Sequence, residues 1–195
     1  MMHPAIELRF VSDHIGYGLF AKQAISRGTI TWAQDGLDRT FTKQELSHLS
    51  KFEMNLIDRY AYLNYDHKQI LCWDMAKYIN HSCKPNVLST GFHFDIAITD
   101  IAKDEELVTD YAMLNLEAPF ECDCGQASCR KTIVSQDIAP LIKTWDHNIR
   151  KIFPLIGDVK QPLWELVPNK DLVKKAIADS AQLPSAAQNL IPEYR

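Results

Sequence analysis

The 195-residue sequence has no apolar stretch of the roughly 18 residues that a membrane span requires. It also lacks a basic start followed by an apolar run, so no secretory signal peptide is expected. No polybasic run of the kind that contacts DNA is found. These absences predict a cytoplasmic protein with no membrane or direct nucleic-acid partner. They leave the nucleus and delivery into another cell open, and they do not predict the oligomeric state.

Cysteine is scarce and odd in number. The chain has five, and their spacing is uneven: Cys72, Cys83, Cys122, Cys124 and Cys129. An odd count without a signal peptide argues against a disulfide scaffold. Reduced thiols are therefore expected, and metal binding is a more plausible role for them than disulfide formation.

The composition is that of an ordinary globular domain, with 46% hydrophobic and 24% charged residues. Charge is uneven along the chain. Residues 1–130 carry 12 basic and 18 acidic side chains, and residues 131–195 carry 9 and 7. An acidic body favours a basic partner, such as a lysine-rich peptide, over nucleic acid.

Hydrophobic periodicity predicts a body of short strands followed by a helical tail, a mostly β fold with α. Thr42-Lys43-Gln44-Glu45 has the pattern of a capping box and would open a helix. Alternation of Phe92, Phe94, Ile96 and Ile98 indicates a strand. The expected strands are 5–11, short pieces of 15–33, 69–73, 86–100 and 107–109, and the expected helices are 42–58, 136–155 and 170–182.

The sharpest local signal is the C-x-C-x₄-C spacing of Cys122, Cys124 and Cys129. Three thiolates so spaced can wrap one tetrahedral metal ion, for which zinc is the natural choice. A structural zinc site has four ligands, so the fourth must come from elsewhere: Cys72, Cys83 or a histidine.

Two further motifs suggest ligand binding. Residues 80–86, Asn-His-Ser-Cys-Lys-Pro-Asn, concentrate groups that can hydrogen-bond a planar base edge. The alternatives are a polar loop or a Cys–His nucleophilic pair. Gly16-Tyr17-Gly18 offers backbone that a ligand can approach closely, or simply a tight turn. Tyr111 ends a strand and, taken alone, is typical of a core edge.

The order of these pieces resembles the SET-domain protein-lysine methyltransferases with a post-SET zinc motif, from about residue 6 to residue 133. The resemblance implies small curved sheets with a knot-like threading that places residues 80–86 beside 106–111. It divides the chain into a SET domain (5–115), a post-SET zinc motif (118–133) and a helical C-terminal extension (134–195).

The implied activity is methyl transfer from S-adenosylmethionine to a lysine side chain of a histone or another protein. By analogy, Tyr111 is the catalytic residue, at the junction of the cofactor and the lysine channel. The cofactor would contact Gly16, Tyr17, Gly18, Asn80, His81, Tyr111 and Phe120. One structural zinc would be bound by Cys83, Cys122, Cys124 and Cys129, which leaves Cys72 as a core thiol. Candidates for the channel wall are Tyr60, Tyr62 and Tyr65.

Two departures from the family pattern matter. Lys77 stands where the family often has arginine, and a planar guanidinium contact is lost there. The residues after Asn86 include no Tyr or Phe of the kind that helps set the number of methyl groups, so that number is not predicted. Two rival hypotheses are a catalytically silent SET-like binding or scaffold module and a zinc-stapled structural domain without cofactor. The presence of Asn80, His81 and Tyr111 favours the enzyme.

Overall fold

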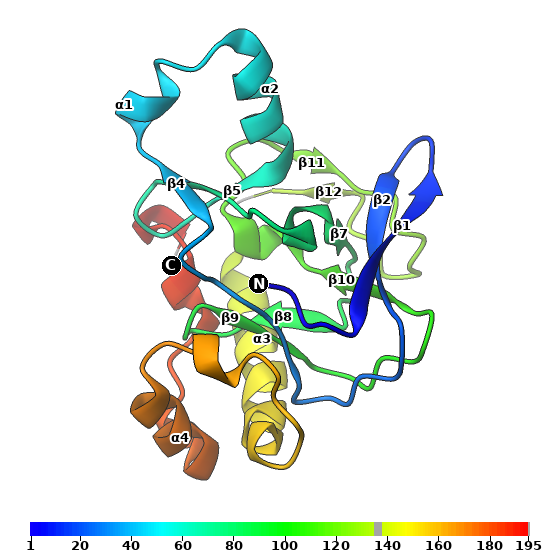
Figure 1. Cartoon of the computed structure of the whole chain (residues 1–195), viewed down its shortest axis with the longest axis vertical. Coiled ribbons are helices and arrows are strands. Elements are labelled where there is room, and N and C mark those ends of the chain that lie inside the picture. The colour runs from blue at the N-terminus through cyan, green and yellow to red at the C-terminus, as the bar shows by residue number, and fades with distance from the viewer. Residues whose placement is uncertain (135–137, 195) are drawn as a thin grey trace.

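A computed structural model describes residues 1–134 and 138–194 (Figure 1). Small sheets form the body, in agreement with the predicted fold class. The largest sheet has the order β1 (Ile6–Ser12), β2 (Gly16–Ala21), β10 (Glu106–Thr109) and β7 (Asn80–His81). Two three-stranded sheets have the orders β3 (Ile30–Ala33), β9 (Phe94–Ala97), β8 (Val87–Ser89) and β4 (Arg39–Phe41), β6 (Gln69–Leu71), β5 (Ala61–Leu63). The last pair is β11 (Phe120–Glu121) with β12 (Thr132–Ile133).

The α-helices are α1 (Lys43–Leu46), α2 (Lys51–Tyr60), α3 (Ile138–Ile152) and α4 (Lys170–Ala178). Short 3₁₀ turns join the elements: η1 (Met75–Tyr78), η2 (Tyr111–Leu114), η4 (Phe153–Gly157), η5 (Trp164–Leu166), η6 (Ser180–Gln182), η7 (Ala186–Asn189) and η8 (Pro192–Tyr194). None of the helices in the described part of the chain has the length and apolarity to cross a membrane.

The parallel pairing of β7 with β10 brings the two motif segments together. Val108 pairs with Asn80 and Thr109 pairs with His81. Asn86 extends the junction, because its Oδ1 accepts from the Val108 amide at 2.9 Å and its Nδ2 donates to the Glu106 carbonyl at 2.8 Å. The predicted adjacency of residues 80–86 and 106–111 is confirmed.

The predicted helix 42–58 is wrong as a single element. Its capping box is confirmed, since Thr42 and Glu45 bond each other's backbone amides. A second capping box, Ser50 with Glu53, ends this first turn and starts α2. A serine at an N-cap fixes extended backbone, so the two boxes divide the segment into two helices. Together they form the lobe that projects from the body in Figure 1.

The predicted strand 86–100 is also divided. A turn at residues 90–93 separates β8 from β9, and the Thr90 hydroxyl donates to the Phe94 carbonyl at 2.9 Å. His93 adopts a left-handed conformation with φ of 61°. The alternation of apolar residues is correct for Phe94 and Ile96, but periodicity alone does not mark a hairpin whose turn residues include Phe92.

The C-terminal helices share the core of the sheets. Trp145 and Ile149 of α3 are buried in one cluster with Phe94 of β9, and the Phe94 ring centroid lies 6.2 Å from that of Phe153. α3 therefore supports the sheets rather than forming a separate body. The start predicted for this helix, residue 136, lies outside the described residues. After Ile152 the chain continues as the 3₁₀ turn η4, where Pro154 removes a backbone donor.

Asn115 ties the last residues of the chain to the body. It is 1% exposed and left-handed, with φ of 56°. Its Nδ2 donates to the carbonyls of Leu63 and Asn189, at 2.8 and 2.9 Å, and its Oδ1 accepts from the Ile191 amide at 2.9 Å. Three backbone groups in the interior thus depend on one side chain.

We expect Asn115→Ala to lower the free energy of unfolding by at least about 3 kcal/mol, because buried groups without partners cost about 1–3 kcal/mol each. Asn169→Ala is the matched control: Asn169 is also left-handed, with φ of 49°, but is exposed and makes no side-chain capping bond. It should cost about 1 kcal/mol. Urea unfolding measures both, and equal losses would show that the buried bonds of Asn115 contribute nothing.

Candidate functional site

The β1–β2 hairpin sets the glycine pair of the first motif against the β7–β10 junction. A Cβ at Gly18 would collide with Glu106 Oε1 and would come within 2.8 Å of Asn80 Nδ2. At Gly16, which is left-handed, a Cβ would meet only the Arg59 guanidinium, at 3.7 Å. Gly18 is therefore required by the packing of three strands, whereas Gly16 borders open space next to a cation. Tyr17, between them, is 49% exposed.

Asn80 uses its amide within the protein. Its Nδ2 donates to the Tyr17 carbonyl at 3.1 Å and to Glu106 Oε1 at 2.7 Å. A base edge in this region would therefore meet the Asn80 side-chain oxygen or backbone rather than the side-chain donor. Glu106 was not predicted as a site residue. The motif Glu-Leu-x-x-Asp-Tyr contains it, but only the fold shows that it bonds Asn80.

His81 connects the tyrosine to the thiols. The Tyr111 amide donates to His81 Nδ1 at 3.1 Å, and His81 Nε2 lies 3.4 Å from Cys83 Sγ. Burial lowers the pKa of His81, more than the nearby Asp110 carboxylate raises it, so the ring is neutral. Because Nδ1 accepts, the ring proton is on Nε2 and points at the sulfur. His81 is then a donor to Cys83.

Three rings form the centre of the site. The His81, Tyr111 and Phe120 ring centroids lie 5.2–5.8 Å apart. The Tyr111 hydroxyl donates to the Ile79 carbonyl at 2.6 Å, which fixes the phenol. Burial, with a smaller effect of the Glu106 carboxylate, raises the pKa of Tyr111 to about 12. The hydroxyl is thus protonated throughout the physiological range.

The four thiols predicted as ligands are brought together from two distant segments. Cys122 Sγ lies 3.9 Å from Cys83 Sγ and 3.6 Å from Cys129 Sγ. A tetrahedral ion with metal–sulfur bonds of about 2.3 Å separates its sulfurs by about 3.8 Å, so these distances fit a metal–thiolate site. The ligand atoms of His81, Cys83, Cys122 and Cys124 all lie within 4.8 Å of one another. Five side chains thus compete for four positions.

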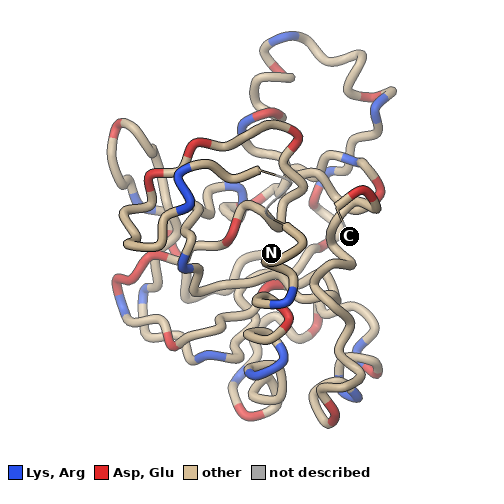
Figure 2. The backbone as a smooth tube through the Cα atoms, turned by 180° about the vertical axis from the view of Figure 1, so that it is seen from behind, with Lys and Arg blue, Asp and Glu red and all other residues tan. Residues whose placement is uncertain are grey.

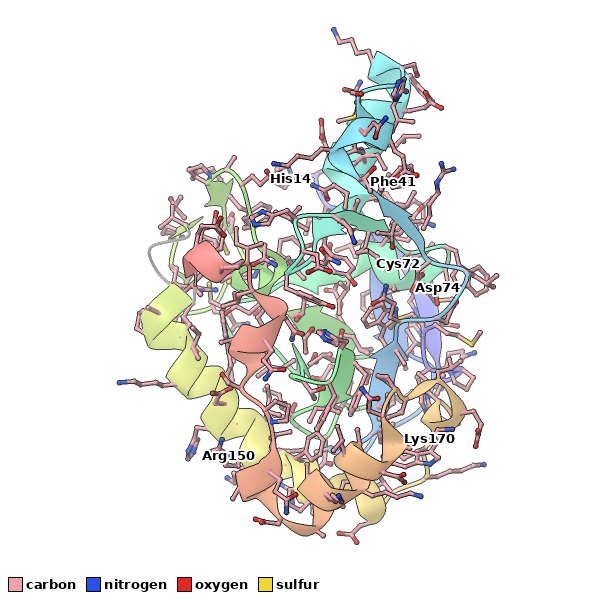
Figure 3. The ribbon with its side chains drawn as sticks, turned by 90° about the vertical axis from the view of Figure 1, so that its left-hand side faces the viewer. His14, Phe41, Cys72, Asp74, Arg150 and Lys170 are labelled. Atoms are coloured by element: carbon pink, nitrogen blue, oxygen red, sulfur yellow. The ribbon has the colours of Figure 1, made fainter. Side chains whose placement is uncertain are left out.

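Electrostatics favour thiolate formation at Cys124. Burial opposes its ionisation, but backbone hydrogen bonds from Cys83 and Gln126 outweigh this and lower the pKa of the thiol to about 6. Cys72 differs: it is 5% exposed, belongs to the core that contains Trp32, and burial raises its pKa. It directly follows β6, in the region of Phe41 and Asp74 in Figure 3. It is a core thiol, as predicted.

A buried carboxylate links the thiols to the tyrosine. Asp110 is 3% exposed and accepts from Arg130 Nη2 at 2.5 Å and from the Trp145 indole at 3.2 Å. The Arg130 Nε donates to Cys83 Sγ at 3.4 Å. Sequence reasoning did not single out these three residues. Two signals are available: Asp110 lies in the motif Glu-Leu-x-x-Asp-Tyr, and Arg130 directly follows the third cysteine of its motif.

A pocket of about 710 Å³ opens beside the three rings. Tyr60, Tyr62 and Tyr65, the predicted channel tyrosines, all line it, together with Tyr111 and Phe120. Gly16, Tyr17, Gly18, Asn80 and His81 are not among its lining residues. Tyr111 and Phe120 therefore stand between the pocket and the glycine–asparagine–histidine side. Lys77 also borders the pocket, and its ammonium donates to the carbonyls of Cys72 and Trp73 at 3.4 and 3.3 Å.

Comparison with known families agrees with this geometry. Residues 16–112 match the family model described as the SET domain. The chain is a SET-domain protein. Among curated proteins, it is 26% identical over 145 residues to histone-lysine N-methyltransferase ASHH3 of Arabidopsis thaliana, covering 67% of this chain and 39% of that protein. It is 28% identical over 141 residues to human histone-lysine N-methyltransferase SETD1B, covering 65% of this chain and 7% of that protein.

The SET-domain chain thus spans less than half the length of these curated relatives. Among solved structures, the methyltransferase domain of human histone-lysine N-methyltransferase SETMAR matches with 20% identity and a TM-score of 0.46, over 69% of this chain and 58% of that one. The match to the family model ends at residue 112, so it does not include the cysteine motif at 122–129.

We expect Cys129→Ser to abolish metal binding and His81→Asn to leave it intact, because four thiolates complete a tetrahedral site and His81 then donates to Cys83 Sγ instead of binding the ion. Elemental analysis of purified protein, given as metal ions per chain, measures both. Loss of metal in His81→Asn with retention in Cys129→Ser would contradict the tautomer assignment.

Proposed function

We propose that this SET-domain chain is an S-adenosylmethionine-dependent protein-lysine N-methyltransferase. The observation that carries the proposal is the position of Tyr111: it belongs both to the ring cluster with His81 and Phe120 and to the wall of the 710 Å³ pocket. A residue placed in this way can orient a group that enters through the pocket toward a cofactor on the far side of the rings.

The target amine must be neutral to accept a methyl group. With a reference pKa of roughly 10.4, only about one lysine amine in a thousand is neutral near pH 7.4. A channel walled by Tyr60, Tyr62 and Tyr111 disfavours the ammonium by desolvation and so lowers the lysine pKa. The pocket wall thus raises the fraction of reactive amine without a dedicated base.

Tyr111 positions the amine instead of deprotonating it. Its pKa of about 12 keeps the phenol neutral, and its proton is engaged with the Ile79 carbonyl. The phenol oxygen retains lone pairs that can accept a hydrogen bond from the lysine amine. Methyl transfer is an in-line displacement, for which alignment supplies much of the rate enhancement.

S-Adenosylmethionine, when bound, supplies a methyl group on a positively charged sulfur. The residues present fit such a ligand. The space beside Gly16 is open, and the neighbouring group there is the Arg59 guanidinium. This cation suits the carboxylate of the methionine part of the cofactor. The His81 and Phe120 rings, which pack edge to face with centroids 5.8 Å apart, offer aromatic surface for the adenine side.

We further propose that Cys83, Cys122, Cys124 and Cys129 bind one zinc ion. Four sulfur ligands favour zinc among the common metals, and the sulfur spacing supports a tetrahedral arrangement. When bound, the ion supplies a covalent link between residues 83 and 122–129. Arg130 and His81 would then donate hydrogen bonds to the Cys83 thiolate. These bonds would restrain the segment that carries Phe120.

The substrate we propose is a lysine of a histone or another protein. The names of the curated relatives describe histone-lysine N-methyltransferases. Figure 2 shows charges of both signs distributed along the chain, and residues 1–130 carry the excess of acidic ones. This balance suits a basic peptide more than nucleic acid. The cytoplasmic location and the absence of a membrane or nucleic-acid partner stay predictions from the sequence.

The test is transfer of labelled methyl from S-adenosylmethionine to a histone panel and a whole-cell lysate. We expect labelling by the wild type and a rate lower by roughly 10²-fold for Tyr111→Phe, since one positioned hydroxyl is lost. Tyr194→Phe is the matched control, because its hydroxyl also donates to a backbone carbonyl, that of Leu116 at 3.2 Å. It should label at the wild-type rate.

Two results would contradict the proposal. If the wild type binds S-adenosylmethionine with micromolar affinity and labels no protein, the silent scaffold hypothesis replaces it. If Tyr111→Phe is as active as Tyr194→Phe, the pocket geometry does not direct the transfer.

A further inference from the structure

A row of three side chains with polar groups crosses the sheet β3-β9-β8 and lines the pocket. Trp32 of β3 pairs with Asp95 of β9, and Asp95 pairs with Ser89 of β8. Directly paired residues of antiparallel strands point to the same face, with Cβ atoms about 5 Å apart. All three residues line the pocket that also contains Tyr111. The proposed methyl transfer makes no use of this row.

The Asp95 carboxylate is only partly satisfied by the protein. The Ser89 hydroxyl donates to its Oδ1 at 2.5 Å. No lysine, arginine or histidine side chain in residues 1–134 and 138–194 forms an ion pair with it. Burial raises the pKa of Asp95 to about 6, against the lowering effects of the Ser89 bond and the N-terminal ammonium. Carboxylates in such surroundings normally have a cationic partner.

The neighbouring indole is also unsatisfied. Trp32 is 8% exposed, and its Nε1 is buried without a hydrogen-bond acceptor. The Tyr62 ring packs edge-on against it, with centroids 6.3 Å apart and planes at 85°. An unpaired buried donor costs about 1–3 kcal/mol. Two neighbouring residues that line one pocket thus carry a carboxylate without a cationic partner and an indole N–H without an acceptor.

We propose that this part of the pocket is a second binding site, for a guanidinium or primary ammonium group held by Asp95 beside the packed rings of Trp32 and Tyr62. The free lone pairs of the carboxylate accept charge-assisted bonds from the cation. Aromatic faces attract the same group. A volume of about 710 Å³ is in the range of whole small-molecule sites and exceeds what one lysine side chain fills.

The source of the cation that we favour is a second basic side chain of the substrate, close to the target lysine. This part of the inference rests on the proposed methyltransferase function, since Tyr111 and Asp95 line the same pocket. Asp95 would then help select substrates that carry two basic residues. A free small cation has the same chemistry, so the test separates the two sources.

The site is tested first without S-adenosylmethionine or peptide. The Trp32 indole N–H is one of four in the chain and is followed by ¹⁵N-resolved NMR at pH 7.5, with Trp32→Phe to assign it. The probe is N-methylguanidinium chloride at constant ionic strength, and N-methylurea is its neutral isostere. We expect the cation to cause a saturable shift of the Trp32 signal. We expect N-methylurea to bind about tenfold more weakly than the cation, or weaker still, because it cannot form a charge-assisted bond.

Asp95→Asn should lower the affinity for N-methylguanidinium by about tenfold or more. The asparagine side-chain oxygen can still accept the hydrogen bond from Ser89. Asp58→Asn is the matched control, since it removes the same charge from an exposed residue that also borders the pocket. Equal binding of guanidinium and urea, or equal binding by Asp95→Asn and wild type, would overturn the proposal. If Asp95→Asn does not fold, the comparison of the two probes on the wild type decides.

The second arm measures methyl transfer to paired peptides with one target lysine, in which a neighbouring arginine is kept or replaced by citrulline. We expect KM to be about tenfold lower for the arginine peptide, and this preference to vanish in Asp95→Asn. Probe binding without any peptide preference would assign the site to a free cation. It would overturn the proposal that the cation is a side chain of the substrate. If the wild type transfers no methyl at all, the proposed function fails, while the probe titration still decides the site.

Discussion

The parallel contact of β7 with β10 is the constraint on which the rest of the site depends. The two strands pair over only two residues each, yet Asn80, His81 and Tyr111 all take their positions from that contact. Asn86 stabilises it with side-chain bonds to Glu106 and Val108, and Ser82 donates its amide to the Thr109 carbonyl at 2.9 Å. A buried asparagine that replaces ladder bonds permits a short crossing to persist, because it supplies partners for the Val108 amide and the Glu106 carbonyl.

The junction is held from outside by the C-terminal part of the chain. Asp110, next to Tyr111, receives Arg130 from the cysteine segment and Trp145 from α3. Since the carboxylate is buried, removal of Arg130 would leave a charge without its ion-pair partner, and removal of Trp145 would cost that charge one hydrogen bond. The thiols, the tyrosine and the C-terminal helix are therefore mechanically one unit. In this arrangement a structural metal would act on Tyr111 at a distance, through His81 and Arg130.

The sequence predicted the parts of the site that local motifs specify. The pairing of residues 80–86 with 106–111 and the Thr42 capping box are confirmed. Prediction failed where a polar residue interrupted a periodic pattern, as at Ser50 between α1 and α2. It also missed Asp110, Arg130 and Trp145, because their contacts join segments up to 35 residues apart and no spacing rule connects them. Asp95 is the clearest case: in the sequence it is the polar member of an alternating strand, and only the opposed strands reveal a pocket there.

We infer that the cysteine cluster and the Tyr111 backbone form one cooperative unit. Hydrogen exchange of the peptide that contains Tyr111, before and after metal removal by a chelator, tests it most directly, because the Tyr111 amide donates to His81 Nδ1. We expect metal removal to speed exchange at Tyr111 by about as much as at the Cys122 amide, which donates to the Lys131 carbonyl at 2.7 Å. Faster exchange confined to residues 120–133, with Tyr111 protected as before, would contradict it.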